Sequence, residues 1–555
     1  MLSPLAAFLK AVEEQPNQVY LRQPVNGRYQ DYTWSEVSEI SKNIAYQLRT
    51  LGVEKGDRVA LWSKNCAQWV MADIAIMMAG AVCVPLYPGQ SKSSAQYVLE
   101  HSGAKVLFLG IHDNESDVID AVPNELTTIG FPYYKGPVSH QWDELAVQQA
   151  DDSFKVDSPD LDDLMTLVYT SGTTGQPKGA MHTHGGFAFA ANNLVEQVGM
   201  TNSDRTLSFL PLAHVAERVI VEGQSFYGWF SIAFVESLDT FNDNITEVRP
   251  TMFFAVPRLW SKFQEGVLAK LGGQEKLDKL LRIPLLSSFI KLKIKKSLGL
   301  DKSVRCGCGA SPMPKALLDW YDRIGLPIYE GYGMTENLCY GTRNDSDGRS
   351  IGSAGRPYNR NEVKISEEGE ILFKSPSLMK GYYKDPEKTQ EAFVDGYYRT
   401  GDKGIIDENG FLHITGRLKE LFKTTKGKYI APAPIEALLT SHEYIEQACV
   451  MGSGRDQPIA VLELSETARG LDKAAVEKEV LDHLEATNSQ LEHHEHMSTL
   501  VLTQLMWTVE AGLITPTLKI KREAVESRYL MLADDKSKGI IWGPEETASK
   551  EHQAA

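Results

Sequence analysis

The chain has 555 residues, of which 42% are hydrophobic and 23% charged, an ordinary balance for a globular protein with large cores. Its length predicts roughly three or four domain-sized units. The formal net charge of -16 argues against a general attraction to nucleic acid or anionic lipid. An anionic ligand would therefore need local backbone N–H groups, lysines or a metal. The six scattered cysteines do not resemble a disulfide framework.

The N-terminal stretch, residues 1–16, has no basic start, and acidic residues follow its short apolar run. We expect a first helix there rather than a signal peptide. The longest apolar stretch, residues 71–87, contains Asp73 and falls just short of a bilayer span. It predicts a core helix leading into a strand. We expect no integral membrane segment and a cytoplasmic protein, with peripheral membrane contact left open.

Through most of the chain, strand-like runs alternate with amphipathic segments. This alternation predicts α/β units with largely parallel sheets. From about residue 350, glycine turns and short strands indicate a smaller β-rich piece. A charged, helix-containing segment follows residue 419, so we place a domain boundary within residues 416–428. The polar residues 536–555 are expected to form a loose tail.

The segment "TSGTTGQPKG", residues 170–179, follows the strand-like run "LMTLVYT". Glycines let a backbone turn tightly and present N–H groups to an anion, and hydroxyls and a lysine add donors and charge. The strand would deliver this loop to the carboxyl edge of a sheet, where α/β folds bind ligands. Because proline precedes the lysine, the common NTPase loop is excluded. The groups suited to phosphate are Ser171, Gly172, Thr173, Thr174, Gly175, Lys178 and Gly179.

Two later stretches carry matching chemistry. In "YEGYGMTEN", residues 329–337, Tyr332 could stack on a base, Thr335 could donate to a phosphate, and Glu336 could ligate Mg²⁺. In "YYRTGDKGIIDENGFLHITGR", residues 397–417, Asp402 could accept ribose hydroxyls and Arg417 could clamp ribose or phosphate. The alternatives without a role in binding are a solvated side chain for Glu336, a surface-turn carboxylate for Asp402 and an ordinary ion pair for Arg417.

These three stretches, in this order, resemble the adenylate-forming superfamily of acyl-CoA synthetases, luciferases and peptide-synthetase adenylation domains. The resemblance runs from about residue 30 to residue 530. Further strings resemble the long-chain fatty-acyl-CoA synthetases within it: "LPLAHVAER" (210–218), "AFVESLDT" (233–240), "AVPRLW" (255–260), "APAPIEALL" (431–439) and "TPTLKIKR" (515–522).

The resemblance implies an α/β fold with a large N-terminal domain, residues 1–418. That domain would hold two parallel βα subdomains plus a small β-barrel-like part. A small, mobile α+β C-terminal domain, residues 419–535, would follow a hinge at Lys419.

It also implies roles for individual residues. The loop from Thr170 to Lys178 would hold the β- and γ-phosphates of ATP. The nucleotide would further meet Gly309, Ala310, Ser311, Tyr332, Gly333, Met334, Asp402 and Arg417. Thr335 would contact the α-phosphate, and Glu336, with Thr170, would bind Mg²⁺. Lys519 would reach the α-phosphate and the acyl carboxylate, and His214 would lie near that carboxylate.

The activity implied is conversion of a fatty acid to acyl-adenylate with ATP and Mg²⁺, then to a thioester with coenzyme A. The substrates would be the chain's partners, without nucleic acid, and the protein would be a monomer or homodimer. Three alternatives stay open. They are a ligase that delivers the acyl group to a carrier protein, a ligase for medium-chain or other acids, and a non-catalytic acyl- or nucleotide-binding protein.

Two further stretches stand out. Residues 289–299, "FIKLKIKKSLG", form a basic amphipathic segment within an acidic chain; a solvated helix face is favoured over membrane contact. Residues 491–497, "LEHHEHM", are interpreted as an exposed patch, with a metal cluster as the alternative.

Overall fold

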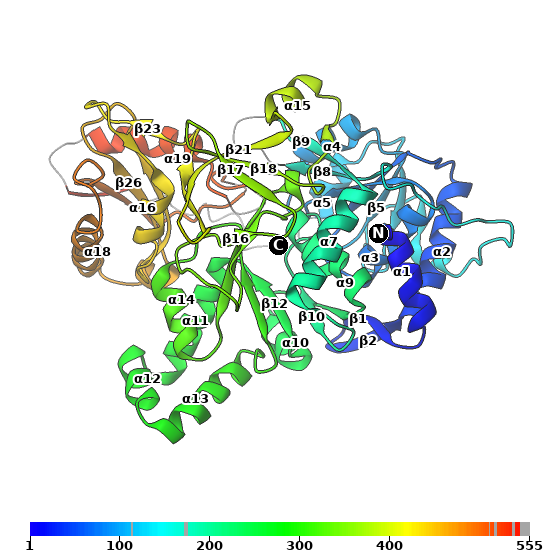
Figure 1. The fold of residues 1–555 in the computed structure, drawn as a ribbon, viewed down its shortest axis with the longest axis horizontal. Helices are drawn as coiled ribbons and strands as arrows, with labels where there is room; N and C mark the ends of the chain where they lie inside the picture. Colours follow the sequence, from blue (N-terminus) through cyan, green and yellow to red (C-terminus); the bar gives the residue numbers. More distant parts are fainter. Residues whose placement is uncertain (113–114, 171–175, 510, 516–518, 535–538, 544–555) are drawn as a thin grey trace. The chain divides into compact units, whose positions relative to one another are not determined.

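The computed structural model describes residues 1–112, 115–170, 176–509, 511–515, 519–534 and 539–543. Contacts divide the chain into two units (Figure 1). The first comprises residues 1–311, 318–364 and 372–399, and the second comprises residues 312–317, 365–371 and 400–555.

One sheet of the first unit contains eight strands, in the order β19-β9-β8-β4-β3-β5-β6-β7. All pairs from β8 to β7 are parallel, and β9 and β19 add antiparallel strands at one edge. The bounds are β3 (Arg58–Trp62), β4 (Val82–Leu86), β5 (Val106–Leu109), β6 (Thr127–Gly130), β7 (His140–Gln141), β8 (Leu164–Thr170), β9 (Lys178–Thr183) and β19 (Gly381–Tyr382).

The other large sheet contains nine strands, in the order β16-β15-β14-β13-β12-β10-β11-β1-β2. The strands from β14 to β1 are parallel, and antiparallel strands close both edges. The bounds are β1 (Val19–Val25), β2 (Arg28–Thr33), β10 (Arg205–Ser208), β11 (Ser231–Phe234), β12 (Met252–Ala255), β13 (Arg305–Cys308), β14 (Ile328–Tyr332), β15 (Thr342–Arg343) and β16 (Arg356–Pro357).

Helices connect these strands, and local sequence sets many of their ends. A capping box of Thr33 and Glu36 starts α2, and glycines in the left-handed conformation end α4 and α7. The helices are α1 (Pro4–Glu14), α2 (Trp34–Thr50), α3 (Ala67–Met78), α4 (Lys92–Ser102), α5 (Glu115–Ala121), α6 (Trp142–Ala146), α7 (His184–Val198), α8 (Val215–Glu217), the π-helical η1 (Arg218–Gly223), α9 (Gln224–Gly228), α10 (Phe241–Val248), α11 (Pro257–Leu271), α12 (Gln274–Leu281), α13 (Pro284–Ser297), α14 (Lys315–Arg323), the 3₁₀ turn η2 (Thr335–Asn337) and α15 (Pro386–Ala392).

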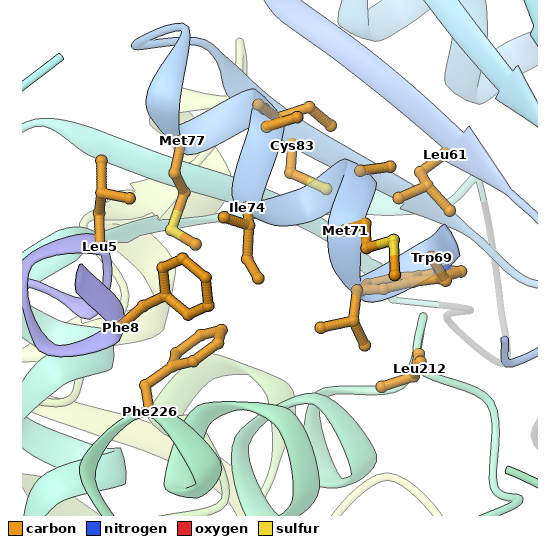
Figure 2. Close-up of a cluster of buried hydrophobic side chains, with 14 of the residues drawn as sticks. Leu5, Phe8, Leu61, Trp69, Met71, Ile74, Met77, Cys83, Leu212 and Phe226 are labelled. Atoms are coloured by element: carbon orange, nitrogen blue, oxygen red, sulfur yellow. The ribbon is translucent and has the colours of Figure 1, made fainter. Parts of the chain in front are cut away.

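Helix α3 lies at the centre of the largest core. All 12 of its residues are buried, as a helix that is apolar on every side requires. Figure 2 shows Ile74 and Met77 of α3 facing Phe8 and Phe226, whose rings lie 6.0 Å apart. The apolar stretch 71–87 is therefore a core helix followed by strand β4, which confirms the expectation from sequence.

A buried ion pair crosses this core. The two Nη2 hydrogen bonds of Arg218 to the Asp73 carboxylate measure 2.6 and 2.7 Å, and Arg218 Nη1 donates to Thr166 Oγ1 at 2.6 Å. Both charged side chains are almost completely buried. Asp73 belongs to α3, Thr166 to β8 and Arg218 to η1. One guanidinium thus joins a helix and a strand of the eight-stranded sheet to the segment that follows β10.

A smaller antiparallel sheet carries strands from both units, because the division passes through β17, β18 and β21. Its strands are β17 (Glu362–Ile365), β18 (Glu370–Lys374), β20 (Phe393–Val394), β21 (Tyr397–Ile406) and β22 (Leu412–Arg417).

The rest of the second unit is α+β. A four-stranded sheet in the order β25-β26-β27-β28 packs with helices around its own core. The elements are β23 (Phe422–Lys423), β24 (Tyr429–Ile430), α16 (Pro432–Leu439), β25 (Ile445–Met451), β26 (Ile459–Leu464), α17 (Glu466–Arg469), α18 (Lys473–Asn488), β27 (Leu500–Thr503), α19 (Arg522–Tyr529), η3 (Leu530–Asp534) and β28 (Ile540–Trp542).

The predicted α/β class is confirmed, with a large N-terminal part built on two mainly parallel sheets and a smaller C-terminal part. The boundary at residues 418 and 419 stays a prediction. Within the expected loose tail, residues 540–542 instead form β28, parallel to β27; the other tail residues, apart from 539 and 543, lie outside the described part. Among the described residues, no helix is long and apolar enough to cross a membrane.

The buried ion pair gives a stability prediction. Arg218→Met should lower the free energy of unfolding by about 3–5 kcal/mol, because it leaves the Asp73 carboxylate buried without its cation. The double variant Asp73→Leu/Arg218→Met should recover much of this loss, since no uncompensated charge remains. Urea titration followed by tryptophan fluorescence measures both. A double variant that is less stable than the single variant would contradict this account.

Candidate active site

Three of the segments singled out from the sequence follow neighbouring strands of the nine-stranded sheet. His214 follows β10, residues 309–311 follow β13, and residues 333–336 follow β14. In the sheet, β10, β12, β13 and β14 are consecutive and parallel. Their carboxyl ends share one edge, which is where α/β sheets bind ligands. The topology therefore brings three sequence-predicted segments to one edge.

The predicted phosphate loop connects β8 and β9. Thr170 ends β8 and Lys178 starts β9, and the two residues pair across the hairpin. The loop thus leaves the carboxyl end of a strand, as the sequence predicted. Its predicted contacts Ser171, Gly172, Thr173, Thr174 and Gly175 lie outside the described residues.

A tight turn holds the segment after β14. A Cβ at Gly333 would lie 2.6 Å from the backbone of Cys339, so no larger residue fits there. Leu338 and Cys339 both have positive φ, 54° and 56°, a region that side chains other than glycine seldom adopt. The Met334 N–H donates to Asn337 Oδ1 at 2.9 Å, and the Cys339 N–H donates to the Met334 carbonyl. This strained turn presents Thr335 and Glu336.

Close packing surrounds two nucleotide-binding candidates beside this turn, Tyr332 and Gly309. The ring of Tyr332 lies 5.6 Å from that of Phe373. A Cβ at Gly309 would lie 3.1 Å from the Phe254 ring and 3.3 Å from the Gly331 carbonyl, so the strand ends of β13 and β14 approach closely there. Ala310 has a φ of 69°, and it and Ser311 are exposed.

The structure adds Tyr382, which the sequence reasoning missed. Its hydroxyl donates to Glu336 Oε1 at 2.9 Å and lies 3.4 Å from the Tyr398 hydroxyl. The Lys178 Nζ lies 5.1 Å from the centre of the Tyr382 ring. Tyr382 therefore connects the lysine of the phosphate loop to the predicted metal-binding carboxylate. No local signal marks it, because it follows Glu336 by 46 positions.

Backbone contacts hold both partners of this bond. The Met379 N–H donates to the Glu336 carbonyl at 2.7 Å, and the Tyr382 N–H donates to Thr389 Oγ1 at 2.9 Å. Burial, with the nearby Glu336 charge, raises the pKa of Tyr382 well above its usual value. The phenol is therefore protonated at neutral pH and remains a donor to the carboxylate.

His214 is held at the start of α8. Its Nδ1 accepts a hydrogen bond from the Ala216 N–H at 3.1 Å. A neutral imidazole that accepts at Nδ1 carries its proton on Nε2, so the neutral ring can donate to a carboxylate from that side. Its ring also meets Tyr87 edge-on, with centroids 6.4 Å apart.

Two buried polar residues clamp the His214 loop. Asn65 donates to Ser208 Oγ at 2.8 Å and to the Leu210 carbonyl at 2.6 Å, and accepts from the Leu212 N–H. Glu217 Oε1 accepts from Ser208 Oγ at 2.7 Å and from a neighbouring backbone N–H. Burial raises the pKa of Glu217 to about 8, although these hydrogen bonds oppose the rise. Neither residue was singled out from the sequence.

Four predicted residues belong to the second unit. Arg417 Nε and Asp402 Oδ1 form an ion pair of 2.9 Å, and the two residues face each other across the β21–β22 hairpin. Lys419 is exposed in the turn after β22. Lys519 is exposed, and its N–H donates to Thr515 Oγ1 at 3.1 Å. By contacts, Asp402 and Arg417 lie in the same unit as Lys419 and Lys519.

The predicted metal ligands suit Mg²⁺ by their chemistry. Glu336 supplies a carboxylate that Tyr382 orients, and Thr170 supplies a hydroxyl oxygen at the end of β8. Mg²⁺ takes oxygen ligands, usually one or two from protein and the rest from phosphates and water.

Two histidines after the phosphate loop are buried. His182 lies within β9, and His184 is the first residue of α7. Burial lowers the pKa of His182 to about 3, opposed by the backbone of Thr335. Burial also lowers the pKa of His184 to about 4, opposed by nearby acidic groups. Both rings are therefore neutral at pH 7.

Two surface cavities lie in the first unit. One, of about 350 Å³, lies among α12, α13 and α14 and contains none of the predicted site residues. The other, of about 440 Å³, is bordered by Tyr382 and the start of α15.

Comparison with known families matches nearly the whole chain. The family model described as AMP-binding enzyme matches residues 8–383, and the model for the C-terminal domain of AMP-binding enzymes matches residues 420–535. The long-chain-fatty-acid–CoA ligase FadD15 of Mycobacterium bovis is 28% identical over 571 aligned positions, which cover 93% of this chain and 94% of the relative.

Solved structures agree on the fold. O-succinylbenzoate coenzyme A synthetase of Bacillus subtilis, in complex with ATP and magnesium ion, matches with a TM-score of 0.73 and 25% identity over 93% of this chain and 98% of that one. The adenylation domain of a carboxylate reductase from Mycobacterium chelonae matches with a TM-score of 0.80 and 23% identity over 96% of this chain and 90% of that one.

The Tyr382–Glu336 bond predicts a change in metal dependence. Tyr382→Phe keeps the ring beside Lys178 but removes the donor to Glu336. We expect the Mg²⁺ concentration for half-maximal acid-dependent ATP–pyrophosphate exchange to rise about tenfold or more, because a hydrogen bond to a charged group contributes roughly 1.5–3 kcal/mol. Tyr383→Phe removes a neighbouring phenol that lies beside His101 and should leave the Mg²⁺ dependence unchanged. Identical titrations for all three proteins would refute the role of Tyr382.

The buried histidines predict a loss of stability in acid. Their folded pKa values lie below the unfolded value, so the unfolded chain binds more protons below about pH 6.5. Stability is complete above that pH and falls as the pH drops toward 4. From pH 7.5 to pH 5, each histidine should cost about 2 kcal/mol. His182→Gln/His184→Gln should flatten this dependence in urea titrations, and substitution of the exposed His493 should not. An unchanged slope in the double variant would contradict this account.

Proposed function

Because the chain belongs to the AMP-binding enzyme family, whose members are ATP-using adenylating enzymes, we propose that it is an AMP-forming fatty-acid–CoA ligase acting on long-chain acids. The observation that carries this proposal is the shared edge of the nine-stranded sheet, where His214, residues 309–311 and residues 333–336 follow neighbouring parallel strands. The similarity to a long-chain-fatty-acid–CoA ligase over 93% of the chain supports the choice of substrate.

The first half-reaction makes an acyl-adenylate. A carboxylate oxygen of the acid attacks the α-phosphorus of ATP, the bond from that phosphorus to the bridging oxygen breaks, and pyrophosphate leaves. Negative charge meets negative charge in this step, so the site must supply cations and directed donors rather than a general base. We assign Lys178 and the loop from Thr170 to the departing phosphates, Thr335 to the α-phosphate, and His214 to the acid.

Glu336 and Thr170 would hold Mg²⁺, which neutralises phosphate charge when bound. Tyr382 would keep one Glu336 oxygen in a fixed orientation, so that the other is available. Tyr332 would stack on adenine, beside the backbone of Gly309, Ala310, Ser311, Gly333 and Met334. Asp402 and Arg417, paired in the structure, would take the ribose.

In the second half-reaction the sulfur of coenzyme A, after losing its proton, attacks the acyl carbonyl carbon. The bond from that carbon to the AMP oxygen breaks, and AMP leaves with the electron pair. Lys519 is assigned to the first half-reaction alone, and Lys419 is proposed as the hinge that exchanges the groups beside the α-phosphate between the two steps.

Release of AMP across a series of acids tests the proposal. With ATP, Mg²⁺ and coenzyme A, long-chain acids such as oleate should support the highest kcat/KM, and acetate and aromatic acids should support little. When coenzyme A is omitted, AMP should not be released, and pyrophosphate release should stop after one turnover, because the acyl-adenylate stays in the site. A preference for short or aromatic acids would overturn the long-chain assignment, and no acid-dependent pyrophosphate release at all would overturn the enzyme assignment.

A carrier-protein acceptor is the second candidate, since the chain also matches the adenylation domain of a carboxylate reductase. That function predicts acid-dependent ATP–pyrophosphate exchange that coenzyme A does not convert to steady AMP release. The absence of a long extra segment between Glu336 and Asp402 in the sequence and the similarity to a CoA ligase over 93% of the chain favour coenzyme A.

The role of Lys519 separates the two half-reactions. Lys519→Ala should lower the rate of adenylate formation by about 10²–10³, the usual effect of removing one stabiliser of transition-state charge. Supplied acyl-adenylate should still be converted to the thioester at a rate close to that of the unmodified protein. Lys521→Ala, two positions along, is the matched control and should affect neither step. Equal loss of both half-reactions in Lys519→Ala would sink this assignment.

A further inference from the structure

Helices α12 and α13 form a hairpin that extends from the first unit at a distance from its two large sheets (Figure 1). Side chains of α12 and α13 connect the hairpin to α14 and the residues after it, among them Lys295, whose Nζ donates to the Gly325 carbonyl at 3.4 Å. Arg323 forms an ion pair with Asp278, and Trp320 Nε1 donates to Gln274 Oε1 at 3.1 Å. Helix α13 has one buried face and one face exposed to solvent.

The inner face of α13 is apolar and buried, at Ile290 and Ile294. The outer face carries Phe289, Leu292, Lys293 and Lys296, at the spacing i, i+3, i+4 and i+7 that places side chains on one side of a helix. The Phe289 side chain is 62% exposed and Leu292 is 44% exposed, and both lysines are exposed. Ile283, in the turn before α13, is 52% exposed.

The charge of this segment is opposite to that of the chain. Residues 279–300 contain Lys279, Arg282, Lys291, Lys293, Lys295 and Lys296 and no acidic residue, whereas the whole chain has a formal net charge of -16. A helix face that only contacts water would carry lysines without exposed apolar side chains. Exposed phenylalanine, leucine and isoleucine among six cations are instead the composition of a helix that lies in the interface of a bilayer.

We propose that the outer face of α13 docks this protein onto a bilayer that contains anionic lipids. Phe289, Leu292 and Ile283 would enter the boundary of the acyl chains, and Lys293 and Lys296 would lie among the headgroup phosphates. Self-association through this face is disfavoured, because a two-fold interface would bring the same lysine-bearing patch of two copies together. The proposal does not depend on which acid the enzyme activates.

Co-sedimentation of the full chain with vesicles tests the proposal. At low salt, the protein should bind vesicles of phosphatidylglycerol and phosphatidylcholine in equal parts, bind vesicles of phosphatidylcholine alone at least about tenfold more weakly, and be released from the former at high salt. Phe289→Ser/Leu292→Ser and Lys293→Gln/Lys296→Gln should each lower the partition coefficient about tenfold or more.

Leu238→Ser is the matched control, because Leu238 is 90% exposed and lies outside the hairpin. It should bind vesicles as the unmodified protein does. Circular dichroism of each variant confirms that folding is retained, as expected for exposed positions. The proposal is overturned if the unmodified protein does not bind anionic vesicles, if the Phe289/Leu292 variant binds as well as the control, or if that variant instead changes the oligomeric state in size-exclusion chromatography.

Discussion

The buried guanidinium of Arg218 is the interaction on which the arrangement of the first unit depends. A charge in a core needs a counter-charge and hydrogen-bond partners to be stable, and the two terminal nitrogens of Arg218 find these in Asp73 and Thr166. A second carboxylate, Glu222, lies 3.5 Å from its Nε. Burial, with the nearby Asp73 charge, raises the pKa of Glu222 well above its usual value.

The positions of these groups in the fold explain their importance for the site. Thr166 lies in β8, four residues before the phosphate loop begins, and Arg218 follows the His214 loop by four residues. Arg218 bonds to Thr166 of β8 and to Asp73 of the central helix α3, and so joins the three elements. The ion pair thus connects the strand before the proposed phosphate loop to the segment that follows His214, the residue proposed to meet the acid. Precise placement of this kind is what an adenylating site requires, because its chemistry depends on charge stabilisation by groups already in position.

The turn that presents Glu336 is likewise held by contacts from distant parts of the chain. The turn that presents it uses left-handed Leu338 and Cys339, a conformation that persists only where surrounding contacts enforce it. Those contacts include the Met379 N–H and the Tyr382 hydroxyl. The exposed basic face of α13 stands apart from this rigid centre. Its proposed bilayer contact would bring the enzyme to the phase in which an amphiphilic acid is concentrated, without any demand on the geometry of the site.

The sequence by itself determined the fold class, the burial of residues 71–87 and the strand that ends at Thr170 before the glycine-rich loop, because periodicity and turn composition are local properties. The ordered motifs also identified the family before any geometry was known. Only the tertiary structure decided that Tyr382 meets Glu336, that Asn65 and Glu217 clamp the His214 loop, and that Asp73 meets Arg218 across 145 positions. It also showed that residues 540–542 join a sheet. Local patterns predict which side chains are buried and where the chain turns. The partner of a buried polar group is instead set by how distant elements pack. A single sequence carries no local signal of that pairing.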